Sequence, residues 1–371
     1  MSFIKSIFRS KKKEYQEATV LLEETSPCCP ITAIVEQDNR VAYLYLCGPE
    51  GSSFGVKSCW IRNLDEAPDK VESKLLEKGI PAMMPQDNCL HPSGLEPLSK
   101  NHLRIVWLEE GDGAALLEND EPLAIISSWG GNGNFYGYSK ESKGEGNFAW
   151  ELNSSNEMLQ RIKDSQNFWD SWEHEINPFQ TQQPKILNVY KYFFGDSERY
   201  FAIADKEGAP RGLYVIEGPK KTVFATVALS LSPMPQIEMY AENRFELNRI
   251  ELGLMLNSKY CESHIQSIAE WFSGTCSIPW KNITFLGEGH TIMFDAFDHP
   301  NFKSVLLTKK ISTLPELSIE NYRNSVVNFL WLIPITEKER QFAIDNGSDS
   351  LIEKLNNIGE EVLSLDRSGT I

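Results

Sequence analysis

The sequence lacks the features that mark several common classes of protein. Its seven cysteines are an odd number and contain no C-x-x-C pair, so neither a disulfide framework nor a familiar zinc knuckle is indicated. No apolar run approaches the roughly 18 residues that a membrane-spanning helix requires. Lysine and arginine total 36 against 52 acidic residues, and the formal net charge of −16 argues against nucleic acid as the main partner. We therefore expect a cytoplasmic protein with free thiols.

The composition that remains is typical of a globular protein. The chain has 371 residues, of which 41% are hydrophobic and 24% charged, which is enough for two domains of ordinary size. Residues 1–13 are basic and their apolar side chains are scattered, so we expect a flexible N-terminus without stable membrane insertion. A short amphipathic helix lying on a membrane surface is the alternative for this segment.

Residues 14–175 are predicted to form a β-rich domain of a family that we do not recognise. The runs 31–36 and 40–46 flank a short polar turn, which indicates a hairpin, and further alternating segments suggest an antiparallel meander. A helix is expected from Pro68 to Gly79. Ser154 and Glu157 form a capping box, which predicts a closing helix over about 155–174.

A linker is predicted next, because residues 176–184 are polar and bounded by proline. Beyond it, residues 187–194 are rich in aromatic residues and are expected to form a strand. Ser263 and Gln266 are expected to open a helix that Gly274 ends. Residues 185–371 are thus predicted as a second domain.

The clearest local signal lies near the C-terminus. The apolar run 327–333 is expected to form a buried strand that stops at Pro334. Thr336 and Glu339 form a capping box for a helix that Gly347 ends, and Ser348 is expected to cap another helix directly afterwards. The whole pattern predicts an α+β fold of two lobes, each a mostly antiparallel or mixed sheet packed with a few helices.

The second half resembles a suppressor of fused (SUFU-like) domain of the microbial type, over about residues 185–358. The matching segments occur in the family's order: Asn188-Val-Tyr190, Thr226-Val-Ala-Leu-Ser230, Ile250-Glu-Leu252, Phe285-Leu-Gly-Glu-Gly-His-Thr291, and the strand–proline–helix unit from Phe329 to Leu355. The sequence departs from the family pattern at Ala228, where many relatives carry glycine. It also lacks a tyrosine after the serine-ended strand, near Leu231–Pro235.

The resemblance implies a binding module and not an enzyme. Animal members hold a transcription-factor peptide as an added strand between two lobes, and microbial members resemble immunity proteins that block a cognate toxin. We therefore predict a protein-binding, immunity-type protein that neutralises a toxin and needs no cofactor. A peptide-binding regulatory or scaffold protein is one alternative, and a hydrolase-like enzyme that uses His290 with a carboxylate is another.

Candidate partner-binding residues follow from the family motifs and from exposed-looking aromatic residues. A groove between the lobes, near His290 and the strand end at Ser230, is the predicted contact region. His290 could serve as a general base or a partner anchor, with Glu288 or Asp295 orienting it, or its imidazole could simply hold the turn together. The predicted contact residues are Ser230, Glu251, Gly287, Gly289, His290, Thr291, Trp129 and Tyr136.

No metal site is predicted. The acidic turns at 109–113 and 118–121 lack the ligand spacing of a calcium loop. Cys89 and His91, taken with the other cysteines, match no zinc spacing. Gly130–Gly133 lacks the lysine of a phosphate-binding loop, and the aromatic residues around it form either an exposed patch or part of the core.

Overall fold

The computed structural model describes residues 15–371 apart from 198 and 204–208, and the chain divides into two compact units. One unit comprises Met1–Ser26, Ile31–Leu108 and Gly113–Lys163, and the other comprises Pro27–Pro30, Glu109–Asp112 and Asp164–Ile371. The basic segment 1–13 lies outside the described residues. Among the residues that are described, no helix is both long and apolar enough to cross a membrane.

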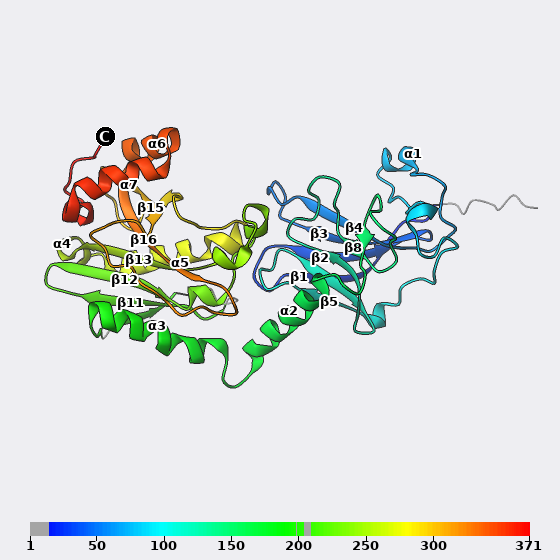
Figure 1. Ribbon diagram of the computed structural model, residues 1–371, viewed down its shortest axis with the longest axis horizontal. Coiled ribbons are helices and arrows are strands. Elements are labelled where there is room, and N and C mark those ends of the chain that lie inside the picture. Colours follow the sequence, from blue (N-terminus) through cyan, green and yellow to red (C-terminus); the bar gives the residue numbers. More distant parts are fainter. Residues whose placement is uncertain (1–14, 198, 204–208) are drawn as a thin grey trace, which may run out of the picture. The chain divides into compact units, whose positions relative to one another are not determined.

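The first unit contains a four-stranded antiparallel sheet and a five-stranded sheet, drawn in blue to green in Figure 1. The predicted hairpin is confirmed, and Asp38 closes its turn by accepting hydrogen bonds from the backbone N–H groups of Arg40 and Val41. The strands of the first sheet are β1 (Thr19–Thr25), β2 (Thr32–Gln37), β3 (Val41–Cys47) and β4 (Val56–Asn63). Those of the second are β5 (Leu103–Trp107), β6 (Ala114–Glu118), β7 (Glu121–Ile126), β8 (Tyr138–Ser139) and β9 (Trp150–Glu151).

Helices of the first half are shorter than the sequence predicts. Only α1 (Ser73–Leu76) forms within the segment expected to be helical from Pro68 to Gly79, and none of its residues is buried. Single 3₁₀ turns, η1 (Gln86–Asn88) and η2 (Lys100–His102), occur nearby. The predicted closing helix is present as α2 (Met158–Glu173), but it begins after Asn156, whose side chain accepts the N–H of Met158.

The segment predicted as a linker, together with the strand predicted after it, is helix α3 (Pro178–Phe194), so both predictions are wrong. Asn177 and Gln180 form a capping box, and Pro178 occupies the first turn, where a missing N–H costs nothing. Ile186 and Tyr190, one turn apart, are buried in the core of the second unit. That burial holds the aromatic segment in a helix despite its preference for strands.

The second unit is built on a seven-stranded mixed sheet in the order β10-β11-β12-β13-β16-β15-β14, in which β13 and β16 pair in parallel and the other described neighbours pair antiparallel. Figure 1 shows α3 running along this sheet beside β11 and β12. The strands are β10 (Arg199–Ala202), β11 (Gly212–Glu217), β12 (Lys221–Val227), β13 (Arg249–Asn257), β14 (Thr291–Met293), β15 (Phe302–Thr308) and β16 (Val327–Thr336). The α+β class is confirmed.

Further helices pack on this sheet. The predicted helix after Ser263 is present as α5 (Ile265–Lys281), but it continues past Gly274 because Cys276 and Trp280 extend its buried face. The other helices are α4 (Ser258–Cys261), α6 (Glu337–Asn346) and α7 (Ser348–Asn357). Short 3₁₀ turns are η3 (Leu229–Leu231), η4 (Ile237–Met239), η5 (Arg244–Glu246) and η6 (Gly359–Leu363).

The strand–proline–helix signal is confirmed in outline and corrected in two details. The capping box of α6 is present, with Thr336 and Glu339 each accepting the other's backbone N–H. Pro334 does not stop the strand: β16 runs through it to Thr336, with Pro334 opposite Val305 of β15. Gly347, at φ +88°, ends α6 and is also the N-cap of α7, so Ser348 is a helical residue and not the cap.

Candidate binding site

Glu251 is a completely buried carboxylate on β13. One of its oxygens accepts hydrogen bonds from the Ser230 hydroxyl (2.7 Å) and the Ser230 backbone N–H (3.0 Å), and the other accepts from the Thr226 hydroxyl (2.6 Å). Burial raises the pKa of Glu251 to about 7, against the opposing effect of these hydrogen bonds. The carboxyl therefore changes protonation near neutral pH while anchoring the turn that follows β12.

Arg249, two residues earlier on the same strand, holds the other side of that turn. Its Nη1 donates to the carbonyl oxygens of Ser230 (2.8 Å) and Leu231 (2.7 Å), and its Nη2 pairs with Glu109 of the same unit (3.2 Å). Burial lowers the pKa of this arginine to about 10, although the Glu109 carboxylate acts in the opposite direction. The Glu251 carboxyl group thus accepts hydrogen bonds from the N–H and hydroxyl of the η3 turn, and the Arg249 guanidinium donates to its carbonyl oxygens.

Ala228, where the sequence departs from the family pattern, lies in a backbone conformation that favours glycine. Ala228 precedes η3 in the left-handed conformation, with φ +71° and ψ 15°. That conformation suits glycine, because it brings the Cβ of other residues close to the following carbonyl oxygen. Ala228 is also completely buried, so its methyl group packs in the core of this unit. The glycine expected from the resemblance therefore corresponds to a real backbone requirement here.

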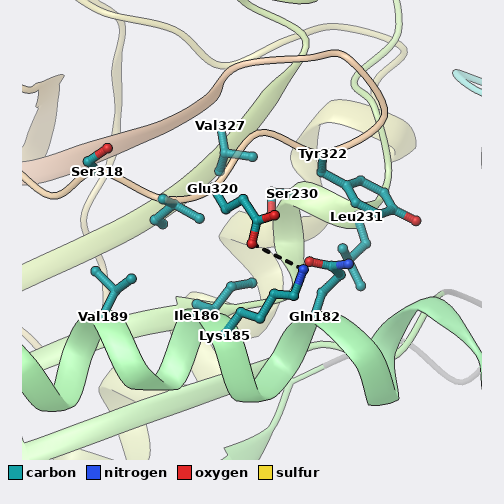
Figure 2. Close-up of a pocket in the computed structure, with 11 residues that line it drawn as sticks. Gln182, Lys185, Ile186, Val189, Ser230, Leu231, Ser318, Glu320, Tyr322 and Val327 are labelled. Atoms are coloured by element: carbon teal, nitrogen blue, oxygen red, sulfur yellow. Dashed lines mark ion pairs between the residues drawn. The ribbon is translucent and has the colours of Figure 1, made fainter.

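A pocket of about 240 Å³ opens beside the η3 turn, between α3 and the segment that leads into β16 (Figure 2). Ser230 and Leu231 form one wall, and Tyr322 forms another. The guanidinium of Arg249 lies 5.0 Å from the centre of the Tyr322 ring, so the same arginine supports both walls. Figure 2 shows Lys185 of α3 paired with Glu320 of the opposite segment, with 3.1 Å between Nζ and Oε2.

The Gly-x-Gly-His turn has a different role, because it leads into the edge strand β14. Gly289 has φ +84°, and a Cβ added there would lie 2.5 Å from the Ser348 hydroxyl, so only glycine fits. Two backbone hydrogen bonds close the turn. The Gly289 N–H donates to the Leu307 carbonyl, and the Leu307 N–H donates to the His290 carbonyl. A Cβ added at Gly287 would be in ordinary van der Waals contact with the Phe285 ring, and Thr291 begins β14.

The His290 side chain packs against aromatic residues. Its ring centre lies 5.0 Å from that of Phe285, which in turn lies 5.2 Å from Tyr240. Burial lowers the pKa of His290, so the imidazole is neutral at pH 7. Glu288 accepts hydrogen bonds from the Thr308 hydroxyl (2.5 Å) and the Lys309 N–H (3.0 Å), so its carboxylate holds the turn. Asp295 lines a separate hollow beside Thr291.

A smaller pocket of about 160 Å³ lies at this turn and is surrounded by apolar surface. Phe285, His290 and Leu330 contribute to its lining, with Glu288 and Lys309 as the charged groups. Leu247, which also lines it, is 47% exposed, and the neighbouring Tyr240 is 75% exposed. We call this region, Tyr240, Leu247, Phe285 and His290, the His290 surface. Apolar residues with this much exposure in one place are typical of interaction sites.

The predicted contact residues fall into separate groups. Ser230 and Glu251 touch each other but are buried, and the pocket that Ser230 lines shares no lining residue with the pocket of His290. Gly287, Gly289, His290 and Thr291 belong together in one turn.

Trp129 and Tyr136 belong to the other unit and are partly buried there. Trp129 packs on that unit's core, its ring centre 6.3 Å from Phe135 and 5.8 Å from the guanidinium of Arg161.

Sequence reasoning missed the residues that organise the first pocket. Arg249 begins the mostly apolar strand β13, two positions before Glu251, and two charged residues in such a strand are a signal of a buried polar network. Lys185 and Glu320 carry no comparable signal, because they are 135 residues apart and belong to ordinary polar stretches. Within the residues that the structure describes, no group of three or more His, Cys, Asp or Glu side chains is arranged to hold a metal ion.

Comparisons with known proteins give the following matches. Residues 211–368 match the family model described as Suppressor of fused protein (SUFU). A SUFU homologue from Neisseria gonorrhoeae is similar in structure, with 16% identity and a TM-score of 0.37, covering 52% of this chain and 97% of that one. No curated protein matches the sequence.

Two further solved structures are similar over about half of this chain. The Sufu–Fu complex gives 11% identity and a TM-score of 0.37 over 51% of this chain and 92% of that one. Drosophila Suppressor of Fused gives 10% identity and a TM-score of 0.35, over 52% of this chain and 51% of that one. The family-model match thus identifies a suppressor of fused domain at residues 211–368, a little under half of the chain.

Proposed function

We propose that the protein is a non-catalytic protein-binding module whose partner is a cognate toxin domain, which it neutralises by covering the active surface. The suppressor of fused domain at residues 211–368 supports protein binding. The toxin as partner rests on the likeness to microbial immunity proteins described above. We also propose a cytoplasmic location, and two domains with the junction ahead of α3, because Ile186 and Tyr190 of that helix pack in the core of the second unit.

The observation that carries this proposal is the His290 surface. Tyr240 and Leu247 expose large apolar groups beside a hollow, and Phe285 and His290 form its aromatic wall. Tyrosine is enriched among residues that dominate binding energy, and a neighbouring hollow can receive an apolar side chain of the partner. Gly287, Gly289, His290 and Thr291 belong to the turn that shapes this surface, and Ser230 and Glu251 act on binding only through the fold.

Charge supports a basic partner. The chain has a formal net charge of −16, which speeds association with a basic protein and disfavours acidic ones. A toxin that acts on nucleic acid requires a basic surface, and covering such a surface needs complementarity but no catalysis. The hydrogen bonds of the polar side chains support a role without catalysis, because Glu251, Ser230 and Glu288 all hold turns in place.

The test measures whether the protein binds a toxin domain encoded beside its gene and whether it protects cells against that toxin. We expect co-expression to restore growth of cells that produce the toxin, and the purified proteins to form a complex by calorimetry. Tyr240→Ala should weaken that complex at least tenfold. Tyr192→Ala is the matched control, because Tyr192 is 85% exposed but lies on α3, away from the His290 surface.

Two results would overturn the proposal. If Tyr240→Ala and Tyr192→Ala weaken the complex equally, the His290 surface is not the interface. If the protein neither binds nor protects against any toxin encoded beside its gene, a toxin is not its partner. Substrate turnover that His290→Ala abolishes, in a variant that melts at the same temperature as the parent protein, would establish the hydrolase alternative instead.

A further inference from the structure

The pocket in Figure 2 combines an apolar interior with opposite charges at its mouth. Lys185 and Glu320 approach from α3 and from the segment before β16, Gln182 lies beside them, and Ser318 lines another part of the pocket. The apolar lining consists of Ile186, Val189, Leu231, Ile319 and Val327. A ligand that suits this pocket has an apolar body and a head that carries both charges.

The ion pair at the mouth is accessible to such a head. The Lys185 and Glu320 side chains are 49% and 65% exposed, and exposed pairs of this kind contribute little to stability. A ligand can therefore separate the two groups at small cost. Its carboxylate would replace Glu320 as the partner of Lys185, while its ammonium group would replace Lys185 as the partner of Glu320.

The walls of the pocket are held in place before any ligand arrives. Arg249 and Glu251 fix the Ser230–Leu231 wall through buried hydrogen bonds, and Arg249 lies against Tyr322 of the opposite wall. Holding a site rigid in this way lowers the entropy that binding must overcome. The pocket is thus a formed site and not a gap between mobile side chains.

We propose that this pocket binds a free α-amino acid with an aliphatic side chain, of which leucine is the model. The volume of about 240 Å³ equals roughly eight water molecules at about 30 Å³ each, which is close to the nine non-hydrogen atoms of leucine. A nucleotide or a peptide of several residues is too large. This site is independent of the His290 surface and does not rest on the proposed toxin partner.

The test uses the full chain and three probes of similar shape: L-leucine, 4-methylpentanoate, which lacks the amine, and 3-methylbutylamine, which lacks the carboxylate. We expect L-leucine to raise the melting temperature and to give a binding isotherm in calorimetry. Each truncated probe should bind at least tenfold more weakly, because it leaves one charge of the pair unpartnered. Binding of 4-methylpentanoate as tight as that of leucine, or no binding of leucine at 10 mM, would overturn the proposal.

Variants locate the site. Glu320→Gln keeps the side-chain shape at an exposed position, and it should weaken leucine binding at least tenfold without changing the fold. Val189→Phe should fill the interior and abolish binding. Asp349→Asn is the control, because it removes another exposed ion pair, Lys310–Asp349, at a site away from this pocket. Leucine binding that survives both Glu320→Gln and Val189→Phe would place the ligand elsewhere and refute the assignment.

Discussion

Two glutamates of the second unit, Glu251 and Glu339, are both completely buried but carry opposite pKa shifts. Glu251 on β13 accepts hydrogen bonds from hydroxyl and amide groups only, and burial raises its pKa to about 7. Burial also acts to raise the pKa of Glu339 in α6, but the bonds from Arg367 and the Thr336 N–H outweigh it, and the pKa lies below its ordinary value.

The comparison shows how strongly a cationic partner affects the charge of a buried carboxylate. Arg367 is itself buried and forms two bonds to Glu339, at 2.6 and 3.1 Å, and one to the Pro334 carbonyl at 2.9 Å. Thr370 adds its N–H and hydroxyl to the same carboxylate. This C-terminal clasp, Arg367 and Thr370 on Glu339, ties the end of the chain to the strand–proline–helix unit.

Breaking the clasp should have the largest effect. Arg367→Met leaves the Glu339 charge buried without its cation, and we expect a loss of about 3–5 kcal/mol in the free energy of unfolding, measured by urea titration. The control is Arg340→Ala, which removes an exposed ion pair with Glu337 and should leave the free energy of unfolding close to that of the parent protein. Adding Glu339→Gln to Arg367→Met should recover part of the loss; a double variant less stable than the single one would contradict the explanation.

The pH dependence of the free energy of unfolding tests the raised pKa of Glu251. The folded pKa of Glu251, about 7, lies above its ordinary value of 4.5, so the native state binds the proton more tightly than the unfolded chain. The stabilisation from this tighter proton binding is fully present below pH 4.5 and is lost as the pH rises through 7. The free energy of unfolding should therefore fall by up to about 3 kcal/mol over this range.

Glu251→Gln removes the titrating group, so the variant should lack this part of the decline in unfolding free energy between pH 5 and 8. The difference between parent and variant isolates Glu251 from other titrating residues. Parallel pH profiles for the two proteins would show that Glu251 is not the group responsible. Glu339→Gln should instead leave the stability changes between pH 6 and 8 unaltered, because its pKa is lowered.

The smallest effect is expected at the helix cap. Thr336→Ala removes the hydroxyl that accepts the Glu339 N–H but leaves the Arg367 pair in place, and it should cost about 1 kcal/mol in urea unfolding. Thr336→Ser keeps the hydroxyl and should stay close to the parent protein. A loss as large as that of Arg367→Met would mean that the cap and the clasp are one cooperative unit.

Local signals in the sequence predict the parts of this fold that depend on near neighbours. The Thr336–Glu339 capping box, the helix end at Gly347 and the hairpin at Asp38 all involve residues within a few positions of each other. The error at α3 arose where two local signals competed. Its Asn177–Gln180 capping box was present in the sequence, but the aromatic run after it favours a strand, and only burial of Ile186 and Tyr190 against the sheet settles the choice.

The sequence by itself determined the capping box of α6, the helix end at Gly347 and the first hairpin, because side chains and glycine act there on adjacent backbone. Tertiary structure alone decided the charges of the two buried glutamates and the making of the leucine-sized pocket. Arg367 lies 28 residues from Glu339, and Lys185 lies 135 residues from Glu320. Electrostatic energies depend on distance and solvent exposure, and folding sets both by joining segments that the chain keeps far apart.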